Sequence, residues 1–304
     1  MNGALGAVLD YIDCVEDYSI RRLSYASDVV KAFSGVGQLL GANMRSAMLF
    51  GLPVRFFDWA ILFRPLRFSP DVSERREGFP SWSWVGWNAI VSWDDVDGPT
   101  PSKSDAPDNG PWYIASRSQV SWQYWSKRSK SFKSMLYEEQ DPDFLDTSLS
   151  CPFDEAGKLR VTAITVTMNL EIRNGEIWIT DSREKIAGRV RGRLLNAAST
   201  SQSPMQGLHT LIILSQRVCR YKLPDLPSNP DMLRSGTHGR VFINMADGYN
   251  ASTNPEPWTP KVLNVMVVEW KDGIAFRKGI GWICKESIDF TYEPCQGTSQ
   301  IVLG

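Results

Sequence analysis

The residues that could perform acid-base or metal chemistry are few and lie far apart in the sequence. The chain of 304 residues contains only two histidines, His209 and His238, and neither has a cysteine or another histidine at metal-ligand spacing. His209 lies in the apolar run LHTLIIL, which is typical of a structural histidine, and His238 lies in the polar segment SGTHGR. A catalytic cysteine-histidine pair would need a tertiary contact that no local signature indicates. The pattern predicts no catalytic residue, no metal ligand and no cofactor, and it favours a binding protein over an enzyme.

Tryptophan is the residue type that stands out. The chain has 12 tryptophans, and the stretch FPSWSWVGW at residues 79–87 places Trp82, Trp84 and Trp87 close together. Exposed indoles could stack on a sugar or a nucleic-acid base. If buried instead, each indole removes about 150–250 Å² from water, and three of them contribute about 11–19 kcal/mol gross at ~25 cal/mol/Å². We therefore predict that Trp82 and Trp84 belong to the core.

The same stretch also indicates a local structure and a candidate binding site. Pro80 followed by alternating tryptophan and serine favours a strand, with Trp82 and Trp84 on one face and both serines on the other. The third indole follows Gly86 and need not share the buried face of that strand. A glycan- or nucleotide-binding protein, or an enzyme, that uses a cleft of tryptophan and arginine is therefore the alternative to a purely structural role. Its candidate binding residues are Trp87, Arg75 and Arg76.

Helical patterns come before this stretch. Residues 24–41 are predicted to form an amphipathic helix, because apolar side chains recur there at helical spacing. Those side chains are Val29, Phe33, Val36 and Leu40. A second helix is predicted to begin at Pro53 and to stop at Pro65. Its apolar face would hold Phe56, Trp59, Ala60 and Phe63.

The later part of the chain is predicted to be rich in β-structure. Asn174-Gly175 and Asp272-Gly273 each separate two alternating runs, as in tight hairpins. LHTLIILS and RVFINM indicate further strands, whereas residues 94–111 are rich in proline and small polar residues. The sequence therefore predicts an α+β fold, with N-terminal helices followed by a largely antiparallel β-rich region. The predicted regions are 1–93, an insertion or linker at 94–158, and 159–304.

Composition excludes several classes of function. The chain has 33 basic and 34 acidic residues, so no field of one sign would attract nucleic acid or an anionic membrane. It shows no secretory signal and no apolar run long enough to span a bilayer. The five cysteines are far apart and form no C-x-x-C pair, which favours reduced thiols. A cytoplasmic protein without a nucleic-acid partner is expected.

Five blocks of the sequence occur in an order that resembles one known family. The blocks are YSIRRLSYASDVVKAFSG at 18–35, FGLPVRFFDWAIL at 50–62, RREGFPSWSWVGW at 75–87, NVMVVEWKDGIAFRKGIG at 264–281 and VLG at 302–304. They resemble the carboxy-terminal region of fungal heterokaryon incompatibility (HET) domain proteins. The likeness covers about residues 11–95 and 205–304, and Ser24, Phe50 and Phe63 depart slightly from the family pattern.

The resemblance implies a function in self/non-self recognition and in incompatibility-type cell death. In that family the defining domain, thought to be TIR-like in fold, precedes these blocks, and we expect it upstream of Met1. Its effector activity therefore cannot be assigned to residues of this sequence. The resemblance implies a non-catalytic recognition or regulatory region with a HET-type effector domain as its possible protein partner, and it indicates no particular oligomeric state.

Overall fold

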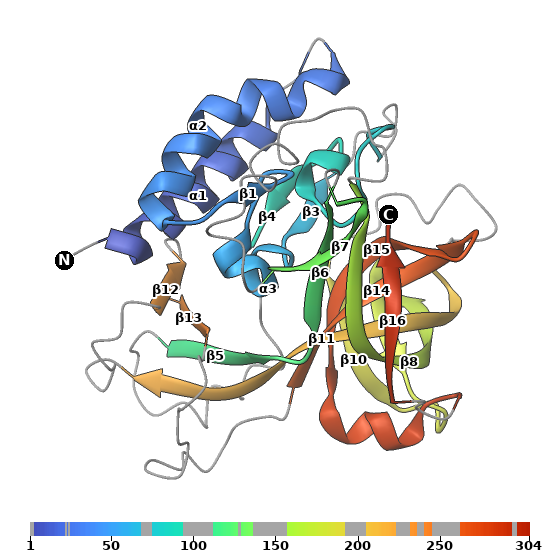
Figure 1. Cartoon of the computed structure of the whole chain (residues 1–304). Helices are drawn as coiled ribbons and strands as arrows, with labels where there is room; N and C mark the ends of the chain where they lie inside the picture. Colours follow the sequence, from blue (N-terminus) through green and yellow to red (C-terminus); the bar gives the residue numbers. More distant parts are fainter. Residues whose placement is uncertain are drawn as a thin grey trace.

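The fold is a helical layer that rests on a large β-sheet (Figure 1). The computed structural model describes residues 3–21, 23, 25–67, 75–93, 112–126, 129–135, 157–191, 205–222, 232–235, 240–244, 262–293 and 297–304. N-terminal helices precede mostly antiparallel strands, so the α+β prediction is confirmed, although strands dominate. None of the helices within the described ranges combines the length and the apolar character needed to cross a membrane.

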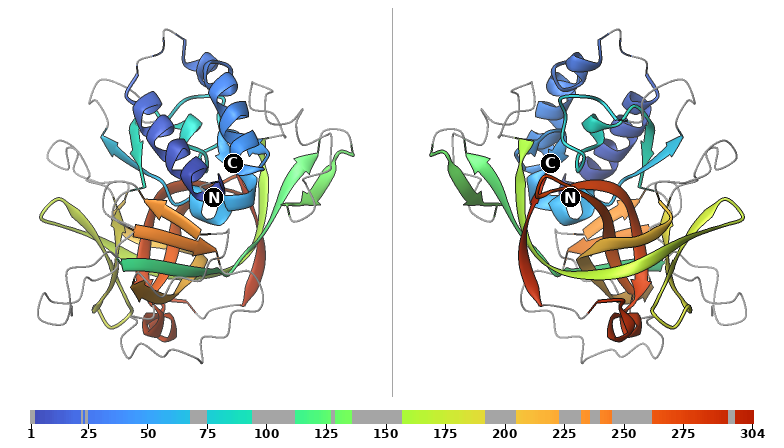
Figure 2. Two further views of the ribbon diagram at one scale, coloured as in Figure 1. Left: turned by 90° about the vertical axis from the view of Figure 1, so that its left-hand side faces the viewer. Right: turned by 90° about the vertical axis from the view of Figure 1, so that its right-hand side faces the viewer.

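Two helices pack side by side on the outside of the molecule (Figure 2). They are α1 (Gly3–Ser19) and α2 (Val29–Met44), with a 3-10 turn at Ala26–Asp28 between them. The helix predicted at 24–41 is confirmed in α2, which ends where Arg45 adopts a left-handed φ of 51°. The prediction that Val36 faces the core is wrong, because Gly37 holds the adjacent buried position and Val36 is exposed. α1 was not predicted from the sequence.

The second predicted helix is much shorter than expected. A 3-10 turn at Val54–Phe56 leads into α3 (Phe57–Ala60), and the helix ends there instead of at Pro65. Pro65 lies in β3 (Arg64–Arg67), which pairs with β4 (Ile90–Ser92). The apolar side chains assigned to this helix are nevertheless all buried. A small hairpin, β1 (Met48–Leu49) with β2 (Leu52–Pro53), precedes it.

Six strands of the main sheet close on themselves. Hydrogen-bonded neighbours run β11, β14, β15, β10, β9 and β8, and β8 pairs back to β11. These strands are β8 (Leu159–Arg173), β9 (Glu176–Thr180), β10 (Ile186–Arg191), β11 (Gly207–Lys222), β14 (Val262–Lys271) and β15 (Ile274–Cys284). Both predicted hairpins are confirmed: Asn174 and Gly175 turn with φ of 54° and 75°, and Asp272 and Gly273 with 52° and 76°.

Further strands extend this sheet on either side. They are β5 (Trp112–Ser118), β6 (Ser121–Ser126), β7 (Ser131–Ser134), β12 (Met232–Ser235), β13 (Arg240–Asn244) and β16 (Thr298–Leu303). β5 pairs with β11 and β6 pairs with β8, so part of the predicted insertion at 94–158 belongs to the sheet. Residues 94–111 and 136–156 lie outside the described residues.

Two apolar cores result from this arrangement. On β14, Val265 and Val267 point into the closed ring of strands, while Met266 and Val268 point toward the helical layer. Alternation along the strand therefore buries both faces of β14. The core beneath the helical layer joins residues from all three predicted regions, among them Tyr11, Trp122 and Leu303.

Candidate functional site

The tryptophan-rich stretch at residues 79–87 forms a turn followed by a 3-10 helix at Trp84–Gly86, so the strand prediction is wrong. The Ser83 side chain starts this helix by accepting a hydrogen bond from the Val85 N–H at 3.2 Å. Gly86 is required by close packing, since a Cβ there would lie 2.2 Å from the Pro80 carbonyl oxygen. The alternation of tryptophan and serine imitates a strand, but both serines are buried too.

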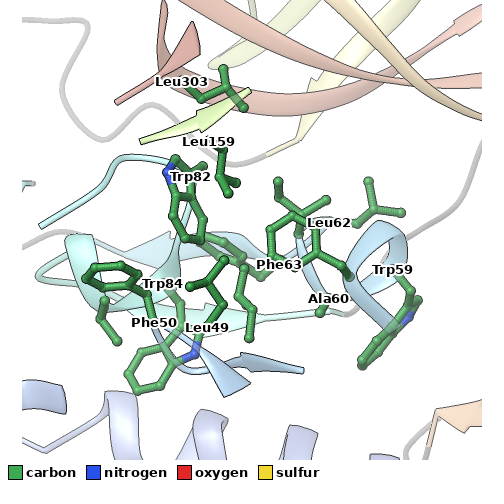
Figure 3. Packing of buried hydrophobic residues seen from close by; sticks show 14 of the residues in the cluster. Leu49, Phe50, Trp59, Ala60, Leu62, Phe63, Trp82, Trp84, Leu159 and Leu303 are labelled. Atoms are coloured by element: carbon green, nitrogen blue, oxygen red, sulfur yellow. The ribbon is translucent and has the colours of Figure 1, made fainter. Parts of the chain in front are cut away.

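The first two indoles of this stretch are core residues, as predicted. Trp82 and Trp84 are 0% and 1% exposed, and aromatic side chains surround them (Figure 3). Trp84 meets Phe33 and Tyr18 edge-on, with ring centroids 5.1 and 5.9 Å apart. Each indole N–H donates to a backbone carbonyl: Trp82 to Gly157 at 3.0 Å and Trp84 to Gly51 at 3.1 Å. Their polar atoms are thus satisfied inside the protein.

Ser81 links three distant parts of the chain. Its backbone N–H donates to the Gly304 carbonyl at 2.9 Å, and its hydroxyl donates to the same oxygen. The hydroxyl oxygen also accepts the backbone N–H of Arg277 at 2.8 Å. We call Ser81, Arg277 and Gly304 the Ser81 hub. The hub joins the tryptophan stretch to β15 and to the residue after β16.

Arg277 is a buried cation that the chemical inspection of the sequence did not single out. Its guanidinium lies 3.8 Å from the Phe63 ring centroid and donates to the carbonyl of Ile61 at 2.8 Å and to that of Phe63. Burial, followed by the nearby charge of Arg75, lowers its pKa well below the ordinary arginine value. The sequence does hold a signal for this position: Arg277 follows the core residue Ala275 by two positions, and residues two apart in a strand lie on the same face of the sheet.

The three candidate binding residues do come together. The Arg75 guanidinium lies 4.7 Å from the Trp87 ring centroid and donates to the Phe79 carbonyl at 3.1 Å. Arg76 donates to the Val85 carbonyl at 2.9 Å, and the Trp87 indole N–H donates to the Ser81 carbonyl at 2.8 Å. Trp87 is only 4% exposed. Burial lowers the pKa of Arg75 to about 10 and also lowers that of Arg76. These contacts all serve internal packing.

The groups considered for catalysis are not assembled into a site within the described residues. His209 is half-buried on β11, and burial, followed by Lys278, lowers its pKa. Cys14 and Cys284 are free thiols whose pKa burial raises. Over the described ranges, no three His, Cys, Asp or Glu side chains gather as metal ligands. His238, Cys151 and Cys295, and the side chain of Cys219, lie outside the described part of the chain.

The surface of the helical layer is the candidate interaction site. Among the described residues, the large exposed apolar side chains are Ile20, Tyr25, Val36, Leu39, Ile186, Leu208, Trp270 and Tyr292. Val36 and Leu39 lie on α2, and Ile20 and Tyr25 lie in the segment between α1 and α2. Sequence reasoning missed this surface because Val36 fitted the apolar helix pattern and was assigned to the core.

Among the described residues, the exposed indole is not part of the tryptophan-rich stretch. Trp270, on β14, is 46% exposed, and its indole N–H donates to Thr210 at 3.2 Å.

No family model, curated protein or solved structure matches the chain. The function is therefore inferred from these contacts and surfaces and from the resemblance of the five sequence blocks.

Proposed function

We propose that this chain is the non-catalytic recognition or regulatory region of a fungal HET-type protein. It binds a HET-type effector domain and so takes part in self/non-self recognition and incompatibility-type cell death. One observation carries the proposal: the sequence blocks that resemble the family converge on one buried assembly. That assembly holds Phe50, Gly51, Trp84 and the Ser81 hub, which come from four of the five blocks.

The contacts within this assembly support a scaffolding role for its polar groups. The Ser83 hydroxyl donates to the Phe50 carbonyl at 2.5 Å, and the Gly51 carbonyl accepts from both Trp84 and Tyr11. Buried hydrogen bonds of this kind are costly to break, because a polar group without a partner pays its full desolvation penalty. The assembly therefore fixes the helical layer on the sheet and leaves the outer surface for binding.

A pull-down with a panel of fungal HET domains tests the proposal. The full chain is the bait, and co-expression of the same pairs in fungal cells reports whether the chain changes HET-dependent cell death. We expect at least one HET domain to be retained and its toxicity to change. Retention of none, together with unchanged viability in every pair, would contradict the proposal.

The glycan- or nucleotide-binding alternative requires Trp87, Arg75 and Arg76 to give up their internal contacts. Titrating tryptophan fluorescence against a panel of oligosaccharides and nucleotides separates the two functions. Quenching that is lost in a folded Trp87→Ala variant would favour the alternative. The buried position of Trp87 leads us to expect no such quenching.

A further inference from the structure

We propose that the outer seam between α1 and α2 binds a basic amphipathic helix of a partner protein. The seam is formed by Asp10, Asp13 and Asp17 on α1 and by Ala32, Val36 and Leu39 on α2, all of which are exposed. This inference rests on the proposed binding function and specifies the chemistry of the partner. Its test uses designed peptides without any HET domain, so the two proposals can fail separately.

The acidic side of the seam is a continuous row. Asp10, Asp13 and Asp17 are spaced three and four residues apart, which places them on one face of α1. Partial burial, followed by the charges of Asp10 and Asp17, raises the pKa of Asp13. No ion pair to these three carboxylates is found within the described residues. Among the described residues, no cation neutralises this row, and its carboxylates can therefore attract a cationic partner.

The apolar side of the seam lies on a different face of α2 from the residues that this helix buries in the core. α2 already buries Val29, Val30, Phe33, Leu40 and Met44 against the rest of the protein. Val36 and Leu39 are 44% and 63% exposed on a different face of the same helix, and Ala32 lies one turn before Val36. A second apolar stripe on an already packed helix marks a surface suited to a partner.

The inner contacts of α1 fix how that helix is turned. One flank of α1 meets α2 through Tyr18. The Tyr18 ring packs on Phe33 with ring centroids 5.3 Å apart, and the Tyr18 hydroxyl donates to the Val29 carbonyl at 3.1 Å. The opposite flank meets β4 and Trp93: Ser19 accepts the Val91 N–H at 3.0 Å, and Glu16 accepts the Trp93 N–H at 3.2 Å. Helical periodicity then points the aspartate row outward, with Asp10 and Asp17 on the side nearer α2.

The contacts of α2 place its apolar stripe on the same seam. The flank that carries Gly41 abuts the turn before β1, where a Cβ at Gly41 would lie 2.8 Å from the Ser46 carbonyl oxygen. Val36 lies two turns after Val29, whose carbonyl accepts the Tyr18 hydroxyl of α1, so Val36 projects from the flank of α2 that faces α1. Figure 2 shows the two helices side by side. The carboxylate row and the apolar stripe thus lie on either side of the seam between neighbouring helices.

The charge pattern selects the occupant. A helix lying along the seam would place apolar side chains on Val36 and Leu39 and lysine or arginine side chains on the aspartates. The exposed cations that the structure describes in this layer lie outside the seam. Arg21 and Arg45 lie beyond the ends of the two helices, and Lys31 projects from the flank of α2 away from α1. A basic amphipathic helix is therefore the complementary partner.

Fluorescence anisotropy with two labelled peptides tests the inference. One peptide is an amphipathic leucine-lysine helix of about 14 residues, and the other has every lysine replaced by glutamate. We expect saturable binding of the lysine peptide to the full chain, weakened by salt. Leu39→Glu and Asp13→Lys should each weaken it about tenfold or more, the size expected for a central contact. Leu208→Glu, a matched change at an exposed leucine of β11, should alter binding less than about twofold.

Three results would overturn the inference. The first is equal binding of the lysine and glutamate peptides. The second is unchanged affinity in Leu39→Glu and Asp13→Lys proteins whose thermal unfolding matches that of the parent. The third is a concentration-dependent dimer, seen by sedimentation and abolished by Leu39→Glu, because that result would assign the seam to a second copy of this chain.

Discussion

Replacing Trp84 by alanine should destabilise the fold severely. The indole is 1% exposed, makes two edge-on aromatic contacts and donates a hydrogen bond to Gly51. Truncating a buried tryptophan to alanine costs about 3–5 kcal/mol through lost transfer free energy and the cavity left behind. The Gly51 carbonyl keeps the Tyr11 hydroxyl as a donor, at 2.8 Å, so no buried acceptor is left unpaired. We expect a loss of about 4 kcal/mol, a large part of the typical stability of a domain.

Urea unfolding followed by circular dichroism measures this loss as a shift in midpoint at constant slope. Trp84→Phe is the conservative comparison, because it keeps an aromatic ring against Phe33 and should lose much less stability. Trp270→Ala is the control for a tryptophan that is 46% exposed, and it should change stability by less than about 1 kcal/mol. A change of less than about 0.5 kcal/mol in Trp84→Ala would refute the assignment of this stretch to the core.

Three further predictions concern the Ser81 hub and α3. Gly304→Ala should lower the free energy of unfolding in urea by about 1–3 kcal/mol, because the new Cβ would lie 2.7 Å from Ile274 Cγ2. Gly35→Ala is the control: open space surrounds Gly35, so this change should be neutral or stabilising. Ser81→Ala should lower the free energy of unfolding by about 1–3 kcal/mol in the same assay, because it removes a hydroxyl that bridges Gly304 and Arg277. An unchanged urea midpoint would show that this bridge does not contribute to stability. Burial raises the pKa of Asp58, and hydrogen bonds from Trp122 and Ser118 lower it by a smaller amount. The contribution of Asp58 to the free energy of unfolding is therefore greatest below about pH 4, and it is lost as the pH rises through the raised pKa. Asp58→Asn should therefore remove part of the fall in unfolding free energy between about pH 4 and pH 7, and an identical fall in both proteins would refute this role for Asp58.

Local signals predicted the parts of the fold that depend on local contacts. Asn174-Gly175 and Asp272-Gly273 adopt the positive φ angles that tight hairpins need, and both hairpins form. The apolar spacing at 24–41 likewise located α2 within a few residues. These elements are specified by their own neighbours along the chain.

The Ser81 hub could not be predicted in the same way, because its contacts are distant in sequence. The Ser81 hydroxyl meets the Gly304 carbonyl 223 residues away and the Arg277 N–H 196 residues away. Burial on every side also removes the alternation of inner and outer faces from which a strand at 79–87 was inferred. The resemblance grouped these residues in order, but not their contacts.

The candidate binding surface was missed for the opposite reason. Val36 has the residue type and spacing of a core position, yet it projects outward beside Leu39. Helical periodicity alone cannot distinguish two apolar faces on one helix when glycines such as Gly37 and Gly41 fill core-facing positions. The position of α1 beside α2 was needed to bring this stripe next to the exposed aspartates of α1.

Calorimetric titration of a panel of fungal HET domains into the full chain tests the central claim most directly. The account predicts saturable binding of at least one domain, with no heat from oligosaccharides or nucleotides injected at the same concentrations. Saturable binding of a nucleotide or a glycan, with no HET domain bound, would contradict it.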